Sequence, residues 1–451
     1  MALADADIAR VERGLRAPVL LAGAPAATRT LSDEMRRLHV PGVSIAVIRK
    51  GRIAWARGYG VAYAGGPAIT PATLFQAASI SKPVTAMAAL RLAERGELDL
   101  DADIDSVLSS WKLPAPEAGV TARRLLSHTA GTGVSGFPGY AADKAVPTLV
   151  QVLDGAAPAN TKPVRIESAP GSAWRYSGGG YSIVQQALID RTGQSFDVLL
   201  QETVLAPIGM HDSRFAQPLQ AALLARAALP HDGEGKPVAG GPYTYPELAA
   251  AGMWTTPSDL ARFALDLQRS LAGGKGVLSP AMARTMLTPV KNGYGLGVNV
   301  EGKGASLSFA HGGSNTGYQN TLFAYANRGD GAVVMTNGAN GAELANSVLR
   351  ALAHEYRWPS QRARVRKAIA LPAAAQTALA GRYVVEGLGD FCIARRAGGL
   401  MIALRGDTWE PLHAAAPNVL FVLSSELELR LDGRGGRIVS GSFDVPFTRA
   451  E

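Results

Sequence analysis

Apolar residues recur at two different spacings along the first 358 residues, and the two spacings predict two kinds of structure. Alternating or continuous apolar runs predict strands at 43–48, 53–63, 294–300, 306–310, 320–326 and 331–337. Apolar residues three and four apart predict helices over 28–38 and 341–356, and they recur through 72–270. We therefore expect an α+β fold, in which helices flank an antiparallel sheet and a mostly helical region is inserted into it.

The pattern of apolar and polar residues changes after Pro359. From Leu379 onward, short alternating runs separated by glycines predict strands at 382–385, 391–395, 400–404, 419–423, 427–431 and 438–443. Strands at this spacing predict a small all-β barrel or sandwich. A chain of 451 residues is also too long for one core. We expect one large domain at 1–358, a linker at 359–376 and a barrel at 377–451.

Composition excludes several classes of protein. The chain is 47% hydrophobic with a net charge of +8, and the charge is dispersed along its length, so we expect no nucleic-acid partner. The basic run from Arg362 to Lys367 lacks interleaved aromatic residues and is interpreted as a solvated linker. The lone Cys392 rules out an internal disulfide. No stretch approaches 18 consecutive apolar residues, so we expect no membrane span; the oligomeric state is left open.

The chain opens Met1-Ala2-Leu3-Ala4-Asp5, which looks like the small-residue end of a signal peptide whose apolar part has been removed. This pattern predicts export to the periplasm or the medium, and it leaves a cytoplasmic location open.

The segment Ser79-Ile80-Ser81-Lys82 carries the most informative chemistry. Pro83 is tolerated only in the first turn of a helix, so we expect a helix that begins at about Ser79. Residues three apart then lie side by side, and the partial positive charge of the helix start favours an alkoxide on Ser79. A buried lysine that has lost its proton can serve as the base for such a serine. An N-capped helix with an exposed lysine is the alternative interpretation.

Two further segments hold candidate residues. In Trp174-Arg175-Tyr176-Ser177-Gly178-Gly179-Gly180-Tyr181, a glycine-rich turn precedes an expected helix over 182–192 and can hold Tyr176 rigidly. In Phe309-Ala310-His311-Gly312-Gly313-Ser314-Asn315, paired glycines at the end of a strand-like run let the backbone approach a ligand.

In this order, Ser-x-x-Lys, Tyr-Ser-Gly and His-Gly-Gly-Ser resemble the serine β-lactamase and penicillin-binding-protein superfamily. The resemblance is to its class C-like branch, which includes class C β-lactamases, D-amino-acid-specific peptidases, family VIII esterases and acyltransferases. Further similar segments lie at 39–47, 125–131, 251–260 and 334–338, so that the resemblance covers roughly 30–358. The C-terminal strands resemble the lipocalin-like domain attached to many of these hydrolases.

The resemblance implies a role for each motif residue. Ser79 would be the acylated nucleophile, and Lys82 and Tyr176 would handle the protons. His311, Gly313 and Ser314 would line the substrate, with the backbone N–H groups of Ser79 and Ser314 forming the oxyanion hole. The resemblance implies neither a cofactor nor a metal.

Two positions depart from the family pattern. The second motif is usually Tyr-x-Asn, whereas Gly178 stands here in place of the asparagine that grips an acylamino substituent. His311 stands where β-lactamases carry lysine, and an imidazole with an ordinary pKa near 6.5 binds a carboxylate less well at pH 7. We therefore expect a serine hydrolase that cleaves a small-molecule ester, amide or peptide. A class C-like β-lactamase or D-stereospecific peptidase, an acyltransferase and a non-catalytic penicillin-binding sensor are the alternatives.

The remaining conspicuous residues have structural explanations. His128, in Leu-Ser-His-Thr-Ala-Gly, is interpreted as a turn histidine, and Ser81 lacks a lysine three residues on. The alternating acids Asp99, Asp101, Asp103 and Asp105 lack the glycine and distal glutamate of a calcium loop.

Overall fold

The computed structural model describes residues 2–114, 119–404, 406, 408–441 and 443–450. The chain forms two compact units: Glu34–Asn346 is one, and Met1–Asp33 together with Ser347–Glu451 is the other. The division into three parts at residues 358 and 376 is based on the change in residue pattern after Pro359, and it stays a prediction.

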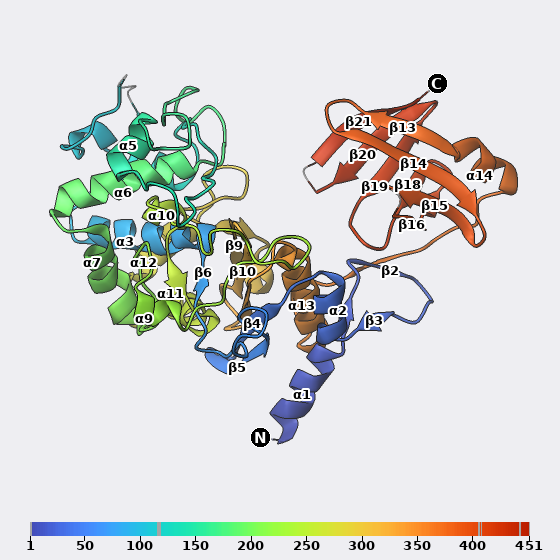
Figure 1. Cartoon of the computed structure of the whole chain (residues 1–451), viewed down its shortest axis with the longest axis horizontal. Coiled ribbons are helices and arrows are strands. Elements are labelled where there is room, and N and C mark those ends of the chain that lie inside the picture. The colour runs from blue at the N-terminus through green and yellow to red at the C-terminus, as the bar shows by residue number, and fades with distance from the viewer. Residues whose placement is uncertain (1, 115–118, 405, 407, 442, 451) are drawn as a thin grey trace. The chain divides into compact units, whose positions relative to one another are not determined.

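A six-stranded antiparallel sheet organises the Glu34–Asn346 unit (Figure 1). Its strand order is β5-β4-β11-β10-β9-β8. The central strands β4 and β11 are buried almost throughout, as continuous apolar runs require. The strands are β4 (Gly42–Arg49), β5 (Arg52–Gly60), β8 (Asn299–Glu301), β9 (Ser308–Asn315), β10 (Tyr318–Tyr325) and β11 (Gly331–Thr336).

Two strands differ from the sequence prediction. The strand expected at 294–300 is reduced to β8, because Gly297 has a left-handed φ of 87° and lies against the helix α3 (Ser81–Glu94). A Cβ atom on Gly297 would come within 2.7 Å of the Ala86 Cβ. The strand expected to end at Ala310 continues to Asn315, so the His-Gly-Gly-Ser motif lies inside β9 and not after it.

The expected helical region is present between β5 and β8, and α3 is its most buried helix. The 3₁₀ turn η1 (Ala78–Ile80) leads directly into α3. The other elements of this region are β6 (Phe75–Gln76), η2 (Ile104–Ser106), α4 (Ala122–Leu126), α5 (Leu149–Asp154), α6 (Gly178–Thr192), α7 (Phe196–Leu200), the π-helical turn η3 (Gln201–Leu205), α8 (Ala206–Ile208), α9 (Ala221–Leu224), α10 (Leu248–Ala251), β7 (Trp254–Thr255), α11 (Pro257–Leu271) and α12 (Pro280–Leu287).

Helix α6 begins four residues earlier than predicted. Ser177 caps it, because its Oγ accepts a hydrogen bond of 2.9 Å from the Gly180 N–H. The glycines allow close packing at this end: a Cβ atom on Gly179 would lie 2.8 Å from the Gly133 carbonyl oxygen. The glycine run is therefore the first turn of the helix.

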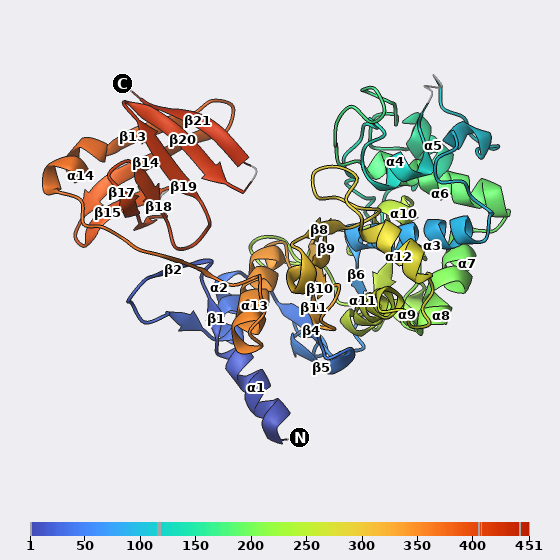
Figure 2. The same ribbon diagram turned by 180° about the vertical axis from the view of Figure 1, so that it is seen from behind.

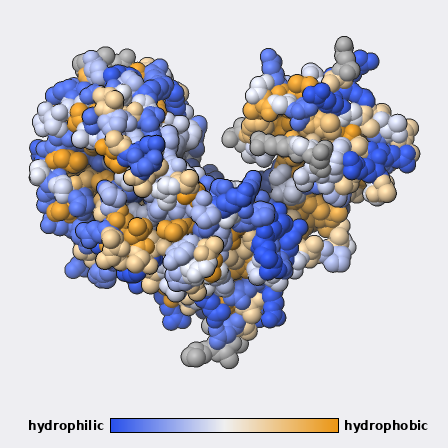
Figure 3. Space-filling model, viewed as in Figure 1, coloured by the Kyte–Doolittle hydropathy of each residue, from blue (hydrophilic) through white to orange (hydrophobic). Residues whose placement is uncertain are grey.

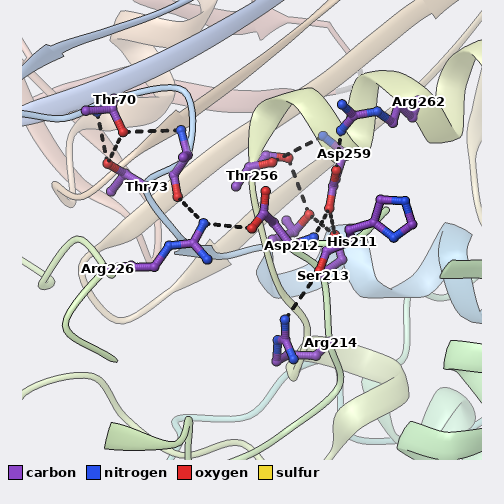
Figure 4. A network of polar contacts seen from close by, with 12 residues as sticks. Thr70, Thr73, His211, Asp212, Ser213, Arg214, Arg226, Thr256, Asp259 and Arg262 are labelled. Carbon is purple, nitrogen blue, oxygen red and sulfur yellow. Dashed lines mark hydrogen bonds and ion pairs between the residues drawn. The ribbon is translucent and has the colours of Figure 1, made fainter. Parts of the chain in front are cut away.

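A polar network around Asp259 holds the start of α11 (Figure 4). The Asp259 N–H donates to Thr256 Oγ1 at 3.2 Å, and the Asp259 carboxylate accepts from the Ser213 hydroxyl at 2.8 Å and from Arg262. From the same loop, Asp212 pairs with Arg226. The network fixes the segment that follows α10.

The second unit contains a nine-stranded, entirely antiparallel sheet that nearly closes into a barrel (Figure 2). Tyr383, Phe391 and Phe447 form the aromatic part of its core, with the first two rings stacked 5.1 Å apart. The predicted small barrel is confirmed. One residue of the strand expected at 438–443, residue 442, lies outside the described residues. The strands are β13 (Gly381–Val385), β14 (Gly389–Arg396), β15 (Gly399–Ala403), β16 (Glu410–Pro411), β17 (His413–Ala416), β18 (Val419–Phe421), β19 (Glu428–Asp432), β20 (Gly435–Ser440) and β21 (Phe443–Arg449).

The basic run at 362–367 is mostly exposed, and part of it has regular structure. It forms β12 (Arg364–Arg366), which pairs in parallel with β2 (Val19–Leu21) near the N-terminus. Arg366 pairs with Glu428 at 2.7 Å and lies over the Phe421 ring. The remaining elements are α1 (Ala2–Glu12), β1 (Leu15–Arg16), β3 (Thr28–Arg29), α2 (Leu31–Arg37), η4 (Gly304–Ser306), α13 (Gly341–Glu355) and α14 (Ala373–Leu379).

Within the described part of the chain, no helix is long and apolar enough to cross a membrane. On the face seen in Figure 3, hydrophobic residues lie in small patches among hydrophilic ones. Scattered patches of this kind are ordinary on folded proteins.

Candidate active site

Ser79 and Lys82 lie in contact at the junction of η1 and α3. Lys82 is 2% exposed, and its Nζ lies 3.0 Å from Ser79 Oγ and 2.8 Å from the carbonyl oxygen of Ala250 in α10. Ser79 is half-buried and therefore reachable from solvent. The alternative of an exposed lysine on an N-capped helix is wrong, because the two functional groups meet inside the protein.

The backbone around Ser79 is held by Ser81. Ala78 has a φ of 52°, which is unfavourable for a residue with a side chain. The fully buried Ser81 hydroxyl donates to the Ala78 carbonyl oxygen at 2.6 Å and accepts from the Met253 N–H at 3.0 Å. Ser81 is thus occupied in fixing the turn that presents Ser79, and the sequence pattern gave no sign of this strain.

Aromatic rings surround the Lys82 amine. The Tyr176 ring centroid lies 4.9 Å from Lys82 Nζ, and that of Tyr181, in α6, lies 5.6 Å away. Among the described residues no carboxylate forms an ion pair with Lys82. The sequence-predicted residues Ser79, Lys82 and Tyr176 therefore lie together, although Tyr176 comes from a loop far along the chain from the turn and helix that carry the other two.

His311 lies close by as a neutral, doubly held imidazole. Its Nδ1 donates to the Gly312 carbonyl oxygen at 2.6 Å, which leaves Nε2 to accept from the Tyr294 hydroxyl at 3.0 Å. Burial, reinforced by the charge of Lys82, lowers the pKa of His311 to about 3. Tyr294 had no recognisable signal in the sequence, because its role depends on a contact across the fold.

His128 supports the tyrosine loop. It is buried, and its Nδ1 accepts from the Ser177 N–H at 3.1 Å, while its ring packs 4.3 Å from that of Tyr176. Burial, followed by the charges of Lys82 and His311, lowers its pKa well below the ordinary value. This neutral histidine holds Tyr176 in place and is the turn residue that the sequence suggested.

Strand β9 approaches η1 closely at Gly313. A Cβ atom on Gly313 would lie 2.1 Å from the Ala77 carbonyl oxygen, so only glycine fits there. Asn315, two residues on, donates to Gln76 Oε1 at 2.7 Å. Ser314 lies between them and is exposed. The strand that carries Ser314 is thus fastened beside the turn that carries Ser79.

Gly178, which replaces the usual asparagine of the second motif, packs against an aromatic ring. A Cβ atom on Gly178 would lie 2.9 Å from the Phe137 ring, so an aromatic side chain occupies the space beside this position. Phe137 is half-buried.

A buried carboxyl group lies at the start of α10, the helix that holds Lys82. Glu247 is fully buried, and within the described residues neither carboxylate oxygen has a hydrogen-bond partner. Burial raises its pKa to about 7. Sequence analysis did not single out Glu247, since nothing local distinguishes it from a surface acid.

The sequence is similar to those of several known proteins. Penicillin-binding protein 4 of Amycolatopsis lactamdurans is 29% identical over 344 residues, which cover 70% of this chain and 86% of the relative. Esterase EstB of Burkholderia gladioli is 33% identical over 219 residues, 45% of this chain and 54% of the esterase, so the match spans about half of that relative.

A solved structure, the octameric penicillin-binding protein homologue from Pyrococcus abyssi, has the same fold. Its TM-score is 0.64 at 21% identity, and the match covers 92% of this chain and 98% of that one. The family model described as Beta-lactamase matches residues 27–356. The chain therefore belongs to the β-lactamase family.

Proposed function

We propose that this protein is a serine hydrolase that forms an acyl-enzyme on Ser79 and cleaves an ester or amide bond. The observation that carries the proposal is the 3.0 Å contact between Lys82 Nζ and Ser79 Oγ, in a buried setting with no carboxylate ion pair among the described residues. A carboxylate there would stabilise the ammonium form, which cannot accept a proton.

In the reactive form Lys82 is a neutral amine. It accepts the Ser79 proton while Oγ attacks the substrate carbonyl carbon, and the backbone N–H groups of Ser79 and Ser314 stabilise the oxyanion. The bond to the leaving oxygen or nitrogen then breaks, and the proton passes through Tyr176 to the leaving group. Water repeats the sequence on the acyl-enzyme and regenerates Ser79.

The surroundings favour esters over β-lactams. The neutral His311 supplies no positive charge for a substrate carboxylate at pH 7. Phe137 fills the space beside Gly178, where no side-chain amide is available to hold an acylamino group. An apolar acyl group suits this environment better.

A substrate panel tests the proposal. Short-chain p-nitrophenyl esters, nitrocefin and D-amino-acid p-nitroanilides are compared by kcat/KM, with and without an added alcohol or amine acceptor, and Ser79→Ala serves as the blank. We expect esters to exceed nitrocefin by at least about tenfold, the scale of one lost charge-assisted hydrogen bond.

The rival functions give other results. Faster nitrocefin or anilide turnover would support a β-lactamase or D-peptidase. Rates that rise with the acceptor would indicate an acyltransferase, and acylation without turnover would indicate a sensor.

A further inference from the structure

A basic hollow lies within the unit formed by Met1–Asp33 and Ser347–Glu451, and no residue of the proposed active site is in its lining. Its volume is about 740 Å³, and three separate segments, 16–26, 350–357 and 362–365, supply its walls. Four arginines line it: Arg16, Arg350, Arg357 and Arg362.

In the part of the chain that the structure describes, three of these arginines form no ion pair, although Arg16, whose pKa burial lowers, lies near enough to Glu355 for that carboxylate to raise it in part. Within the described residues, none of Arg16, Arg357 and Arg362 forms an ion pair. Arg16 Nε donates to the Gly14 carbonyl oxygen at 3.1 Å, and Arg362 Nε donates to the Trp358 carbonyl oxygen. Carbonyl groups orient a guanidinium without cancelling its charge, so the hollow keeps an excess of positive charge.

The one acidic residue in the lining is already engaged. Glu355 Oε1 accepts from Arg10 Nε at 3.0 Å and from Arg10 Nη2 at 2.8 Å. Burial, followed by the charge of Arg16, lowers the pKa of the neighbouring His354, although Glu355 acts in the opposite direction. With four arginines and one glutamate, the lining carries more positive than negative charge.

The walls of the hollow are fixed in place. Strands β2 and β12 are paired, with Leu20 opposite Val365, and both residues line the hollow. Arg350 Nε donates to the Arg16 carbonyl oxygen at 2.9 Å, which joins α13 to β1. A site with fixed walls loses little entropy when a ligand binds.

We propose that this hollow binds a small oxyanion that carries two or more negative charges. Its volume falls within the range of small-molecule sites. Guanidinium groups match phosphate and carboxylate oxygens in pairs. The described lining contains no Phe, Tyr or Trp, the large rings on which nucleobases stack best, and His354 is its one ring.

Isothermal titration of the full chain tests this proposal, with inorganic pyrophosphate and citrate as separate probes and acetate as the monovalent reference. We expect saturable 1:1 binding of pyrophosphate, citrate or both, and none of acetate. The double variant Arg16→Gln/Arg362→Gln should weaken binding by at least about tenfold, and Arg357→Gln alone by several-fold. Arg284→Gln, which removes an exposed arginine of α12, should bind like the wild type.

Each outcome has a defined meaning. Binding of pyrophosphate alone identifies a phosphorylated ligand, and binding of citrate alone identifies a polycarboxylate. No saturable heat with either probe, or equal losses in Arg284→Gln and the pocket variants, would overturn the proposal. Arg357 is exposed, so Arg357→Gln keeps the test decisive if the double variant does not fold. Ester hydrolysis should be unchanged in every variant and serves as the check of folding.

Discussion

At the scale of single residues, the account depends on how Lys82 is held. Its amine has two polar contacts, Ser79 Oγ and the Ala250 carbonyl oxygen. Two tyrosine rings lie beside the amine, and among the described residues no carboxylate forms an ion pair with it. The two histidines nearby, His128 and His311, are neutral, because burial lowers the pKa of each. These contacts place the amine beside the hydroxyl that it is proposed to deprotonate.

Lys82 and Tyr176 should act as a unit. Lys82→Ala and Tyr176→Phe should each lower kcat by about 10² to 10⁴, because each removes a step of proton transfer. The double variant should lose far less than the product of the two. Lys275→Ala and Tyr63→Phe, both at exposed positions, are the matched controls. Full additivity in steady-state kinetics would show that the two residues work independently.

Glu247 should make the fold less stable as pH rises. Its folded-state pKa of about 7 lies above the ordinary 4.5, so the unfolded chain loses this proton first. Stability should fall between about pH 4.5 and 7 and then level off, by on the order of 3 kcal/mol. Glu247→Gln should remove this loss and be the more stable protein at pH 8.

Urea unfolding of wild type and Glu247→Gln across this pH range measures the difference. The exposed Glu301→Gln is the control, since its carboxyl group remains in water when the protein folds. Parallel pH profiles for wild type and Glu247→Gln would contradict the burial of an unpaired carboxyl group.

At the scale of elements, the periodicity of the sequence predicted most strands and helices, whereas tertiary contacts decided the exceptions. The strand expected before β9 was cut short by Gly297, whose packing on Ala86 has no local signature. Ser79 and Lys82 were singled out by their spacing at a helix start, whereas the roles expected of Tyr176 and His311 came from the resemblance to a known family. Tyr294 and Glu247 were missed, because burial beside distant partners defines them.

The approach of β9 to η1 should be sensitive to one methyl group. In Gly313→Ala the new Cβ would lie 2.1 Å from the Ala77 carbonyl oxygen, so the strand or the Ser79 turn must move. We expect kcat/KM for esters to fall by at least about tenfold. Gly312→Ala is the control, because its nearest neighbour would be the Asn320 carbonyl oxygen at 3.8 Å. Equal activity of Gly313→Ala and wild type would mean that this approach does not shape the site.

At the scale of the whole molecule, every proposed catalytic residue lies in Glu34–Asn346, while the N-terminal segment shares a unit with the barrel. The pairing of β2 with β12 joins these two ends of the chain. The alternation of apolar and polar residues was enough to predict a barrel. The parallel pairing of β2 with β12 could not be predicted in this way, because the two strands lie far apart in the sequence and share no pattern.

Removal of the barrel should leave the chemistry and impair the fold. A chain that ends at Pro359 loses β12, so β2 loses its partner and the protein should be less soluble. Ser79 should still react with a small fluorophosphonate. Circular dichroism and labelling of the soluble fraction provide the check: a folded but unreactive chain would show that the barrel contributes to the active site.

The most direct test of the central claim is to map the site of acylation. The full-length protein is treated with a fluorophosphonate, digested and analysed by peptide mass spectrometry. We predict one adduct, on Ser79, that is absent in Ser79→Ala and forms much more slowly in Lys82→Ala. An adduct on Ser81 or Ser177, or labelling that persists in Ser79→Ala, would contradict the account.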